Sequence, residues 1–122
     1  MTSLHEKFLK IEKDISNERG EFNLFALAYR DIEENKFDVI LSADWINVQD
    51  KEVMKYIVNV IKKELISEEM IAISRIILLE KENPILKELT RLIKISHSVV
   101  EFKECKFNNI RLDRVIIFSS KN

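Results

Sequence analysis

The stretch that decides the fold runs from Phe22 to Ala43 and reads FNLFALAYRDIEENKFDVILSA. It contains two mostly apolar runs, FNLFALAYR and FDVILSA, separated by the short polar segment DIEENK. Aromatic and β-branched residues favour strands, and so short a polar link most simply joins two strands as an antiparallel hairpin. Leucine and alanine in the first run keep a helix open as the alternative there. A hairpin at this place argues against an all-parallel sheet.

Helices are predicted on both sides of this hairpin, each behind a capping residue. Ser3, with Glu6 three residues later, predicts a capping box for a helix over residues 4–17, and Gly20 is the expected C-cap. Apolar residues then recur at helical spacing behind each predicted cap. The other expected N-terminal signals are Asp50 for a helix over 51–66, Ser67 for a short helical turn, and Asn83 with Pro84 for a further helix.

The remaining strands complete the predicted order. SRIILLE, at 74–80, is the third strand, and SVVEFKE at 98–104 and RVIIFSS at 114–120 are the last two. The segment between these last two could turn at Asn108–Asn109 or form a short strand of its own. The order αββααβαββ predicts a single α+β domain over 1–122, with a mixed or antiparallel sheet of about five strands and helices packed on it.

Composition excludes several kinds of active site. The chain has one glycine, Gly20, whereas phosphate-binding loops and the nucleophile elbow of hydrolases need several. One cysteine, Cys105, can form neither an internal disulfide nor a cysteine-based zinc site. The net charge of −1 gives no support for nucleic-acid binding, and the first 17 residues show no apolar signal-peptide core. We therefore expect a cytoplasmic protein without metal, cofactor or membrane association.

One set of residues fits a metal-dependent nuclease. In an extended strand Glu101 and Lys103 share a face, as the metal-binding acid and the assisting lysine of such enzymes do. Asp44, which closes the FDVILSAD segment, is the best candidate for the second acid, and Asp38 is the next. Because a Glu-x-Lys pair is common in a chain that is 34% charged, a solvated strand face is the favoured interpretation.

The two histidines and the cysteine have weaker functional signals. Along the predicted strand, His97 and Cys105 share a face with Glu101. Their separation is too long for a direct hydrogen bond in an extended chain, so a cysteine nucleophile with a histidine base is not favoured. We expect Cys105 to be an inert, partly buried thiol, and His5 and His97 to lie at the surface or at a strand edge.

The segment SADWINVQD offers a candidate binding patch. Trp45, beside Asp44 and Asp50 in a loop after a strand, would suit recognition of a partner. The alternative, which we favour, is that Trp45 folds back and plugs one end of the core, since a chain of this size has few large residues to spare.

Taken together, these features favour a small non-enzymatic protein-binding module of the immunity, antitoxin or adaptor type. Its partner would be another protein or a second copy of itself, captured at a sheet edge. The expected adhesive surfaces are the strand from Arg114 to Ser120, predicted to be an edge, and the loop around Trp45. The alternatives are the nuclease and a small-molecule sensor with an apolar pocket under the helix over 51–66.

Overall fold

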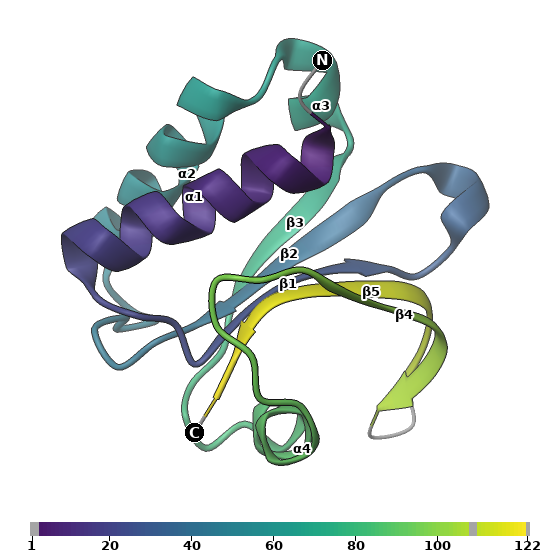
Figure 1. Ribbon diagram of the computed structural model, residues 1–122. Coiled ribbons are helices and arrows are strands. Elements are labelled where there is room, and N and C mark those ends of the chain that lie inside the picture. The colour runs from purple at the N-terminus through teal and green to yellow at the C-terminus, as the bar shows by residue number, and fades with distance from the viewer. Residues whose placement is uncertain (1–2, 108–109, 122) are drawn as a thin grey trace.

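The computed structural model describes residues 3–107 and 110–121, and it shows one α+β domain (Figure 1). The helices are α1 (Leu4–Arg19), α2 (Lys51–Glu64), α3 (Ser67–Ile71) and α4 (Pro84–Leu92), with a 3-10 turn at Ile32–Glu34. The strands are β1 (Leu24–Tyr29), β2 (Phe37–Ser42), β3 (Ile73–Leu78), β4 (Val100–Phe107) and β5 (Ile110–Ser120). The predicted order αββααβαββ is confirmed.

The strands form one mixed five-stranded sheet with the order β3-β2-β1-β5-β4. β1 and β2 pair antiparallel from Leu24 opposite Ser42 to Ala28 opposite Asp38, which confirms the hairpin. β5 pairs antiparallel with both β1 and β4, whereas β3 is parallel to β2. The parallel pair is the one whose strands are joined through helices, as a crossover connection requires.

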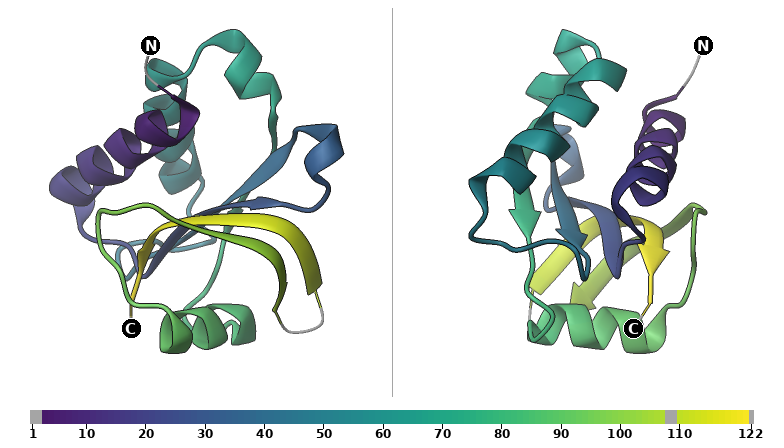
Figure 2. Two further views of the ribbon diagram at one scale, coloured as in Figure 1. Left: turned by 45° about the vertical axis from the view of Figure 1, so that its right-hand side comes forward. Right: turned by 90° about the vertical axis from the view of Figure 1, so that its left-hand side faces the viewer.

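Helices cover both faces of the sheet (Figure 2). α1 and α2 lie on one face, and α4 lies on the other. Because both faces of β1 are covered, all six of its residues are buried. Phe25, Leu27 and Tyr29 point into the core beneath α1 and α2, and Leu24 and Ala26 point into the core beside α4. This alternation is the period of two that a strand imposes on its side chains.

The predicted starts of α1, α2 and α4 correspond to observed caps, whereas α1 ends two residues later and α2 two residues earlier than predicted. Ser3 Oγ accepts a hydrogen bond from Glu6 N at 3.1 Å, and Asp50 and Asn83 cap α2 and α4 in the same way at 2.9 Å. Pro84 occupies the start of α4. α3 begins at Ser67 as predicted, but the cap is different: Glu69 Oε1 accepts from Ile66 N at 2.9 Å. A carboxylate there satisfies a backbone donor that the helix leaves free.

Two predictions about the C-terminal half are wrong. The segment Arg114–Ser120 is not a sheet edge, because β5 lies between β1 and β4. Its side chains are apolar on both faces, with Ile116 and Phe118 in one core and Val115 and Ile117 in the other. Apolar side chains buried on both faces are typical of a central strand and not of an edge strand. The predicted turn at Asn108–Asn109 lies outside the described residues.

The other wrong prediction concerns the alternation along β4. Phe102 and Cys105 both pack beside the α4 core, although the regular pattern puts them on opposite faces. Glu104 between them has a positive φ of 51°, so the backbone departs from regular extended geometry there, although the pairing with β5 keeps the same register on both sides of it. Cys105 therefore does not share a face with Glu101. His97, with φ 50°, precedes the strand and is not part of it.

Within the described part of the chain, no helix has the length and apolarity needed to cross a membrane.

Candidate functional site

The structure does not bring the nuclease candidates together. Asp44 follows β2, is exposed and pairs with Lys81 at 2.8 Å, whereas Glu101 lies on β4 and pairs with Arg114. β1 and β5 separate these two strands, so three strand spacings, about 14 Å, lie between them. Carboxylates that share one metal ion must approach it to within about 2.0–2.6 Å. Lys103 is exposed on β4.

The described residues hold no other arrangement suited to a metal. No group of three or more histidine, cysteine, aspartate or glutamate side chains lies close enough together among them to hold an ion. Asp38, the second candidate acid, is buried and bound to arginine. Cys105 is partly buried, as expected, and burial raises the pKa of its thiol, which lowers its reactivity at neutral pH.

Trp45, Asp44 and Asp50, the candidate binding residues, each make a contact of their own within the fold. Trp45 Nε1 donates a hydrogen bond to Gly20 O at 2.8 Å, and its ring packs edge-on against Phe22 at 5.6 Å. This is the packing that the plug interpretation expects. Asp50 caps α2, and Asp44, which follows β2, pairs with Lys81, which follows β3.

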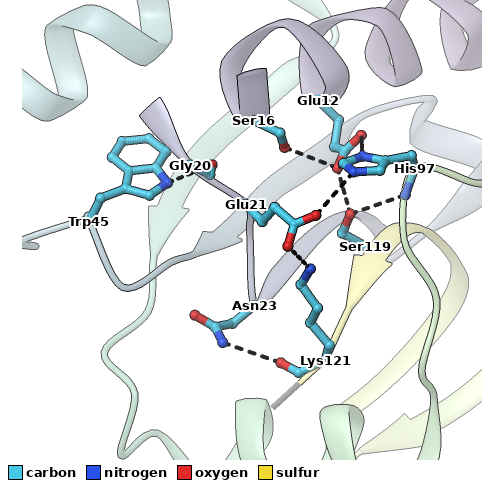
Figure 3. Close-up of polar contacts among 9 residues, drawn as sticks. All are labelled: Glu12, Ser16, Gly20, Glu21, Asn23, Trp45, His97, Ser119 and Lys121. Atoms are coloured by element: carbon cyan, nitrogen blue, oxygen red, sulfur yellow. Dashed lines mark hydrogen bonds and ion pairs between the residues drawn. The ribbon is translucent and has the colours of Figure 1, made fainter. Parts of the chain in front are cut away.

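A buried acid that sequence reasoning missed lies at the junction of α1, β5 and the segment before β4 (Figure 3). Glu12, fully buried, accepts hydrogen bonds from Ser119 Oγ at 2.6 Å and Ser16 Oγ at 3.3 Å. His97 Nδ1 lies 2.8 Å from its Oε1 and 2.9 Å from its Oε2. The available signal was Glu12 itself, which lies directly after Ile11 and four residues after Phe8 in the apolar stripe of α1.

The charge state of this junction follows from its contacts. Hydrogen bonding to Glu12 raises the pKa of His97, and burial opposes this to a smaller extent. On the outer side His97 Nε2 lies 3.4 Å from Glu21 Oε1, and Glu21 also pairs with Lys121. His97 was expected at the surface or at a strand edge; it is instead partly buried and bound to Glu12, and the two side chains form an ion pair when the imidazole is protonated.

The junction has the composition of a hydrolytic triad but not its geometry. A serine nucleophile must give its proton to the imidazole, which a carboxylate orients from the other side. Here the Ser119 hydroxyl donates to Glu12, and the nitrogen of His97 that a nucleophile would need faces Glu21. The arrangement therefore tethers the segment before β4 to α1 and β5.

The second candidate feature is an apolar cavity of about 160 Å³ on the α4 face of the sheet. Its position follows from β1, where the side chains toward α4 include Ala26 and Ala28, whereas those on the opposite face are Phe25, Leu27 and Tyr29. Two small side chains in the middle of a sheet leave space that a short helix does not fill. The lining residues are Leu24, Ala26, Ala28, Arg30, Asp38, Ile40, Ile77, Leu79, Ile85, Leu89, Ile110, Leu112 and Val115.

Arg30 and Asp38 are the polar members of this lining. Asp38 is 5% exposed, and Arg75 donates to its carboxylate from Nε at 3.3 Å and from Nη2 at 2.9 Å. Arg30 Nε lies 3.5 Å from Asp38 Oδ2. Burial raises the pKa of Asp38, and the positive charge of Arg30 acts in the opposite direction. One carboxylate is thus flanked by two guanidinium groups.

A larger polar hollow of about 400 Å³ contains Lys81, Lys87 and Lys121. Lys81 already pairs with Asp44 and Lys121 with Glu21, so most of its positive charge is compensated by acids. This hollow therefore offers a weaker site for an anion than its lysines suggest.

The third feature is the edge of the sheet at β3, which pairs with β2 alone. Its sequence, ISRIIL, has a single charged residue, Arg75, and that residue is engaged by Asp38. β4, at the other edge, contains Glu101, Lys103, Glu104 and Lys106. Charged residues on an edge strand hinder the addition of a further strand, so β4 is protected in this way and β3 is not.

Two large apolar side chains in the segment that leads into β3 are exposed. In α3, which leads directly into β3, Ile71 is 71% exposed, and Ile66 just before it is 56% exposed. Together with β3 they form the β3 edge surface, which we define as Ile66, Ile71 and residues 73–78.

Comparisons with known proteins gave no match: no protein-family model, no curated protein and no solved structure matches this chain.

Proposed function

We propose that this chain is a non-enzymatic protein-binding module that accepts an extended segment of a partner polypeptide as a sixth strand beside β3. The observation that supports the proposal is the contrast between the two edges of the sheet. β4 is charged along its length, whereas β3 is apolar, and its one charge is already engaged. Strand addition of this kind derives its affinity from main-chain hydrogen bonds.

The backbone of β3 has groups free for such pairing. Leu79 N donates to Leu41 O at 2.8 Å, which directs the polar groups of residues 77 and 79 toward β2. Because successive residues of a strand direct their backbone groups to opposite sides, those of Ile76 and Leu78 point away from β2. These two residues would exchange hydrogen bonds with the added strand.

The surroundings of β3 favour an apolar partner segment. Ile71 and Ile66 would cover alternate side chains of an added strand, and burying them would contribute about 25 cal/mol for each Å² removed from water. The partner is another protein with such a segment, or a second copy of this chain joined β3 to β3. The two surfaces expected from the sequence are less suited to binding a partner. The strand from Arg114 to Ser120 belongs to β5, which is central in the sheet, and Trp45 packs on Phe22.

The test uses displayed short peptides of extended, alternating apolar sequence, selected against the purified chain. Bound peptides should slow hydrogen exchange at the Ile76 and Leu78 amides. Ile71→Lys should weaken their binding, because it places a charge beside β3. Leu92→Lys is the matched control, since Leu92 is also exposed, at 60%, but lies on α4.

Sedimentation of the chain alone shows whether a second copy occupies the same edge. Association that Ile71→Lys abolishes and Leu92→Lys preserves would identify the self-pairing form of the proposal. The proposal fails if selected peptides leave the Ile76 and Leu78 amides unprotected, or if both lysine variants bind them as tightly as the parent chain.

A further inference from the structure

We infer that the cavity on the α4 face binds a compact apolar carboxylate, with its ring or branched chain against Ala26 and Ala28 and its carboxylate at Arg30. This site lies on a face of the sheet, whereas the proposed strand addition uses the backbone at the β3 edge. The inference therefore does not depend on the proposed function, and either can fail without the other.

The size of the cavity sets the size of the ligand. Protein interiors are close-packed and contain few voids larger than a water molecule, so an apolar hollow of about 160 Å³ departs from ordinary packing. A protein cavity of about 150 Å³ lined by leucine, isoleucine and phenylalanine stays dry and takes up benzene. One six-membered ring, or a branched chain of similar volume, therefore fits here.

The hollow results from three features of the chain. Ala26 and Ala28 leave space in the middle of the sheet, and α4 has only nine residues, so it covers only part of this face. The β4–β5 hairpin curls around the same side of the sheet and contributes Ile110 and Leu112 to the lining (Figure 2). The ligand would thus contact a wall built from the sheet, α4 and the hairpin.

The charges at one end select the head group. Arg75 makes a two-pronged contact with Asp38, which largely satisfies that carboxylate. Within the described residues, the polar contact of Arg30 is a single approach of its Nε to Asp38 at 3.5 Å, and its side chain is 63% exposed. Its remaining donors can receive a carboxylate, for which the planar guanidinium is well matched. Asp31 and Glu34 line the neighbouring hollow and not the cavity.

The experiment compares three probes with one ring and different head groups: benzoate, benzyl alcohol and benzylamine. Each is titrated to about 10 mM, which reveals dissociation constants in the millimolar range, while the methyl signals of the protein are followed by NMR. Benzoate should bind most tightly and benzylamine least. Nuclear Overhauser contacts should join the ring of benzoate to the methyl groups of Ala28, Ile77 and Leu112.

Two variants and one control separate the contribution of the ligand's head group from that of its ring. Arg30→Gln should weaken benzoate binding about tenfold and leave benzyl alcohol unchanged, because a hydrogen bond to a charged group is lost. Arg111→Gln, on the exposed part of β5, is the matched control and should change neither. Ala28→Leu should fill the hollow and abolish binding of all three probes.

The outcomes are decisive whether or not Ala28→Leu folds, because the contacts of the ring in the unaltered protein locate the site directly. Contacts of the ring only with the core beneath α1 and α2, or no binding of any probe, would overturn the assignment of the cavity. Equal or tighter binding of benzylamine would overturn the assignment of the carboxylate and identify Asp38 as the selecting group.

Discussion

A single buried carboxylate connects three distant parts of this chain. Glu12 of α1 accepts a hydrogen bond from the hydroxyl of Ser119 on β5. It also contacts the imidazole of His97, in the segment before β4. A charge placed in a core is tolerated only when hydrogen bonds and an opposite charge compensate its desolvation. Loss of any one contact of Glu12 should therefore lower the stability of the fold more than loss of a comparable contact at the surface.

Replacing Glu12 with glutamine should lower the free energy of unfolding by about 1–3 kcal/mol, because the hydrogen bonds to a charged acceptor become neutral ones. Urea unfolding near pH 6 measures this change. Glu68→Gln, an exposed acid-to-amide change on α3, is the control and should stay within about 0.5 kcal/mol of the parent. An equally small effect at Glu12 would show that the pair adds nothing to stability.

The same pair predicts a pH dependence. The pKa of His97 is raised in the folded state, so its contribution to stability is complete below the ordinary histidine pKa of about 6.5. It is lost as the pH rises from there through the raised folded value. The difference in unfolding free energy between the parent and His97→Gln should therefore shrink across this window.

Taking that difference removes the effect of His5, whose pKa burial lowers and which acts in the opposite direction. A difference that stays constant between pH 5 and about 8 would contradict the assignment of the titration to His97.

Gly20 is the second residue whose identity is dictated by its surroundings. Its φ of 126° and ψ of 162° lie in a region that is essentially restricted to glycine, and a Cβ there would lie 3.0 Å from Trp45 Cδ1. Gly20→Ala should cost about 1–3 kcal/mol of unfolding free energy. The fluorescence of Trp45, the one tryptophan in the sequence, should report the displaced ring. An unchanged spectrum and stability would refute the close approach.

At the scale of elements, β3 differs from the other strands in the protection of its backbone. The amides of Ile77 and Leu79 point toward β2, and those of Ile76 and Leu78 point outward. In dilute solution we expect hydrogen exchange to be fast at Ile76 and Leu78 and slower at Ile77 and Leu79. Equal protection at all four positions in a monomeric sample would mean that the edge is already covered.

Elements were predictable from the sequence where the signals are local. The caps at Ser3, Asp50 and Asn83 lie within a few residues of the donors they satisfy, so a short window reveals them. The position of β5 was not predictable in this way, because strand order depends on pairing between distant segments. Apolar residues on both faces are typical of a central strand, and the prediction of an edge did not take this signal into account.

The candidate sites were less accessible to sequence reasoning than the elements. His97 and Glu12 are 85 positions apart, and no local pattern joins them. The backbone departs from extended geometry at Glu104, and Cys105 packs beside the same core as Phe102, which an ideal alternation cannot foresee. The cavity depends on two alanines that, read singly, look like ordinary strand residues.

At the scale of the whole molecule, the two faces of the sheet are packed unequally. The large fully buried aromatic residues Phe8, Phe22, Phe25, Phe37 and Phe118 all belong to the core beneath α1 and α2. The buried residues of the core beside α4 are all aliphatic, and this core borders the cavity. Because local stability follows the density of buried apolar contacts, α4 should open more readily than α1.

This inequality can be measured with two core substitutions. Ile57→Ala, beneath α2, should lower the free energy of unfolding by about 2–5 kcal/mol and accelerate hydrogen exchange throughout the sheet. Leu89→Ala, on α4, should accelerate exchange mainly at the amides of α4 and leave those of α1 nearly unchanged. Uniform acceleration by both would show that the two cores open together.

The central position of β5 also constrains how the protein forms during translation. Leu24 pairs with Ser120 across 96 positions, so β1 leaves the ribosome long before its neighbour is synthesised. Until then one backbone edge of β1 is unpaired, on a strand whose six residues are all buried in the folded protein, and unpaired edges with uncovered apolar side chains promote the aggregation of nascent chains. A chaperone that shields this strand during synthesis would therefore increase the yield of native protein.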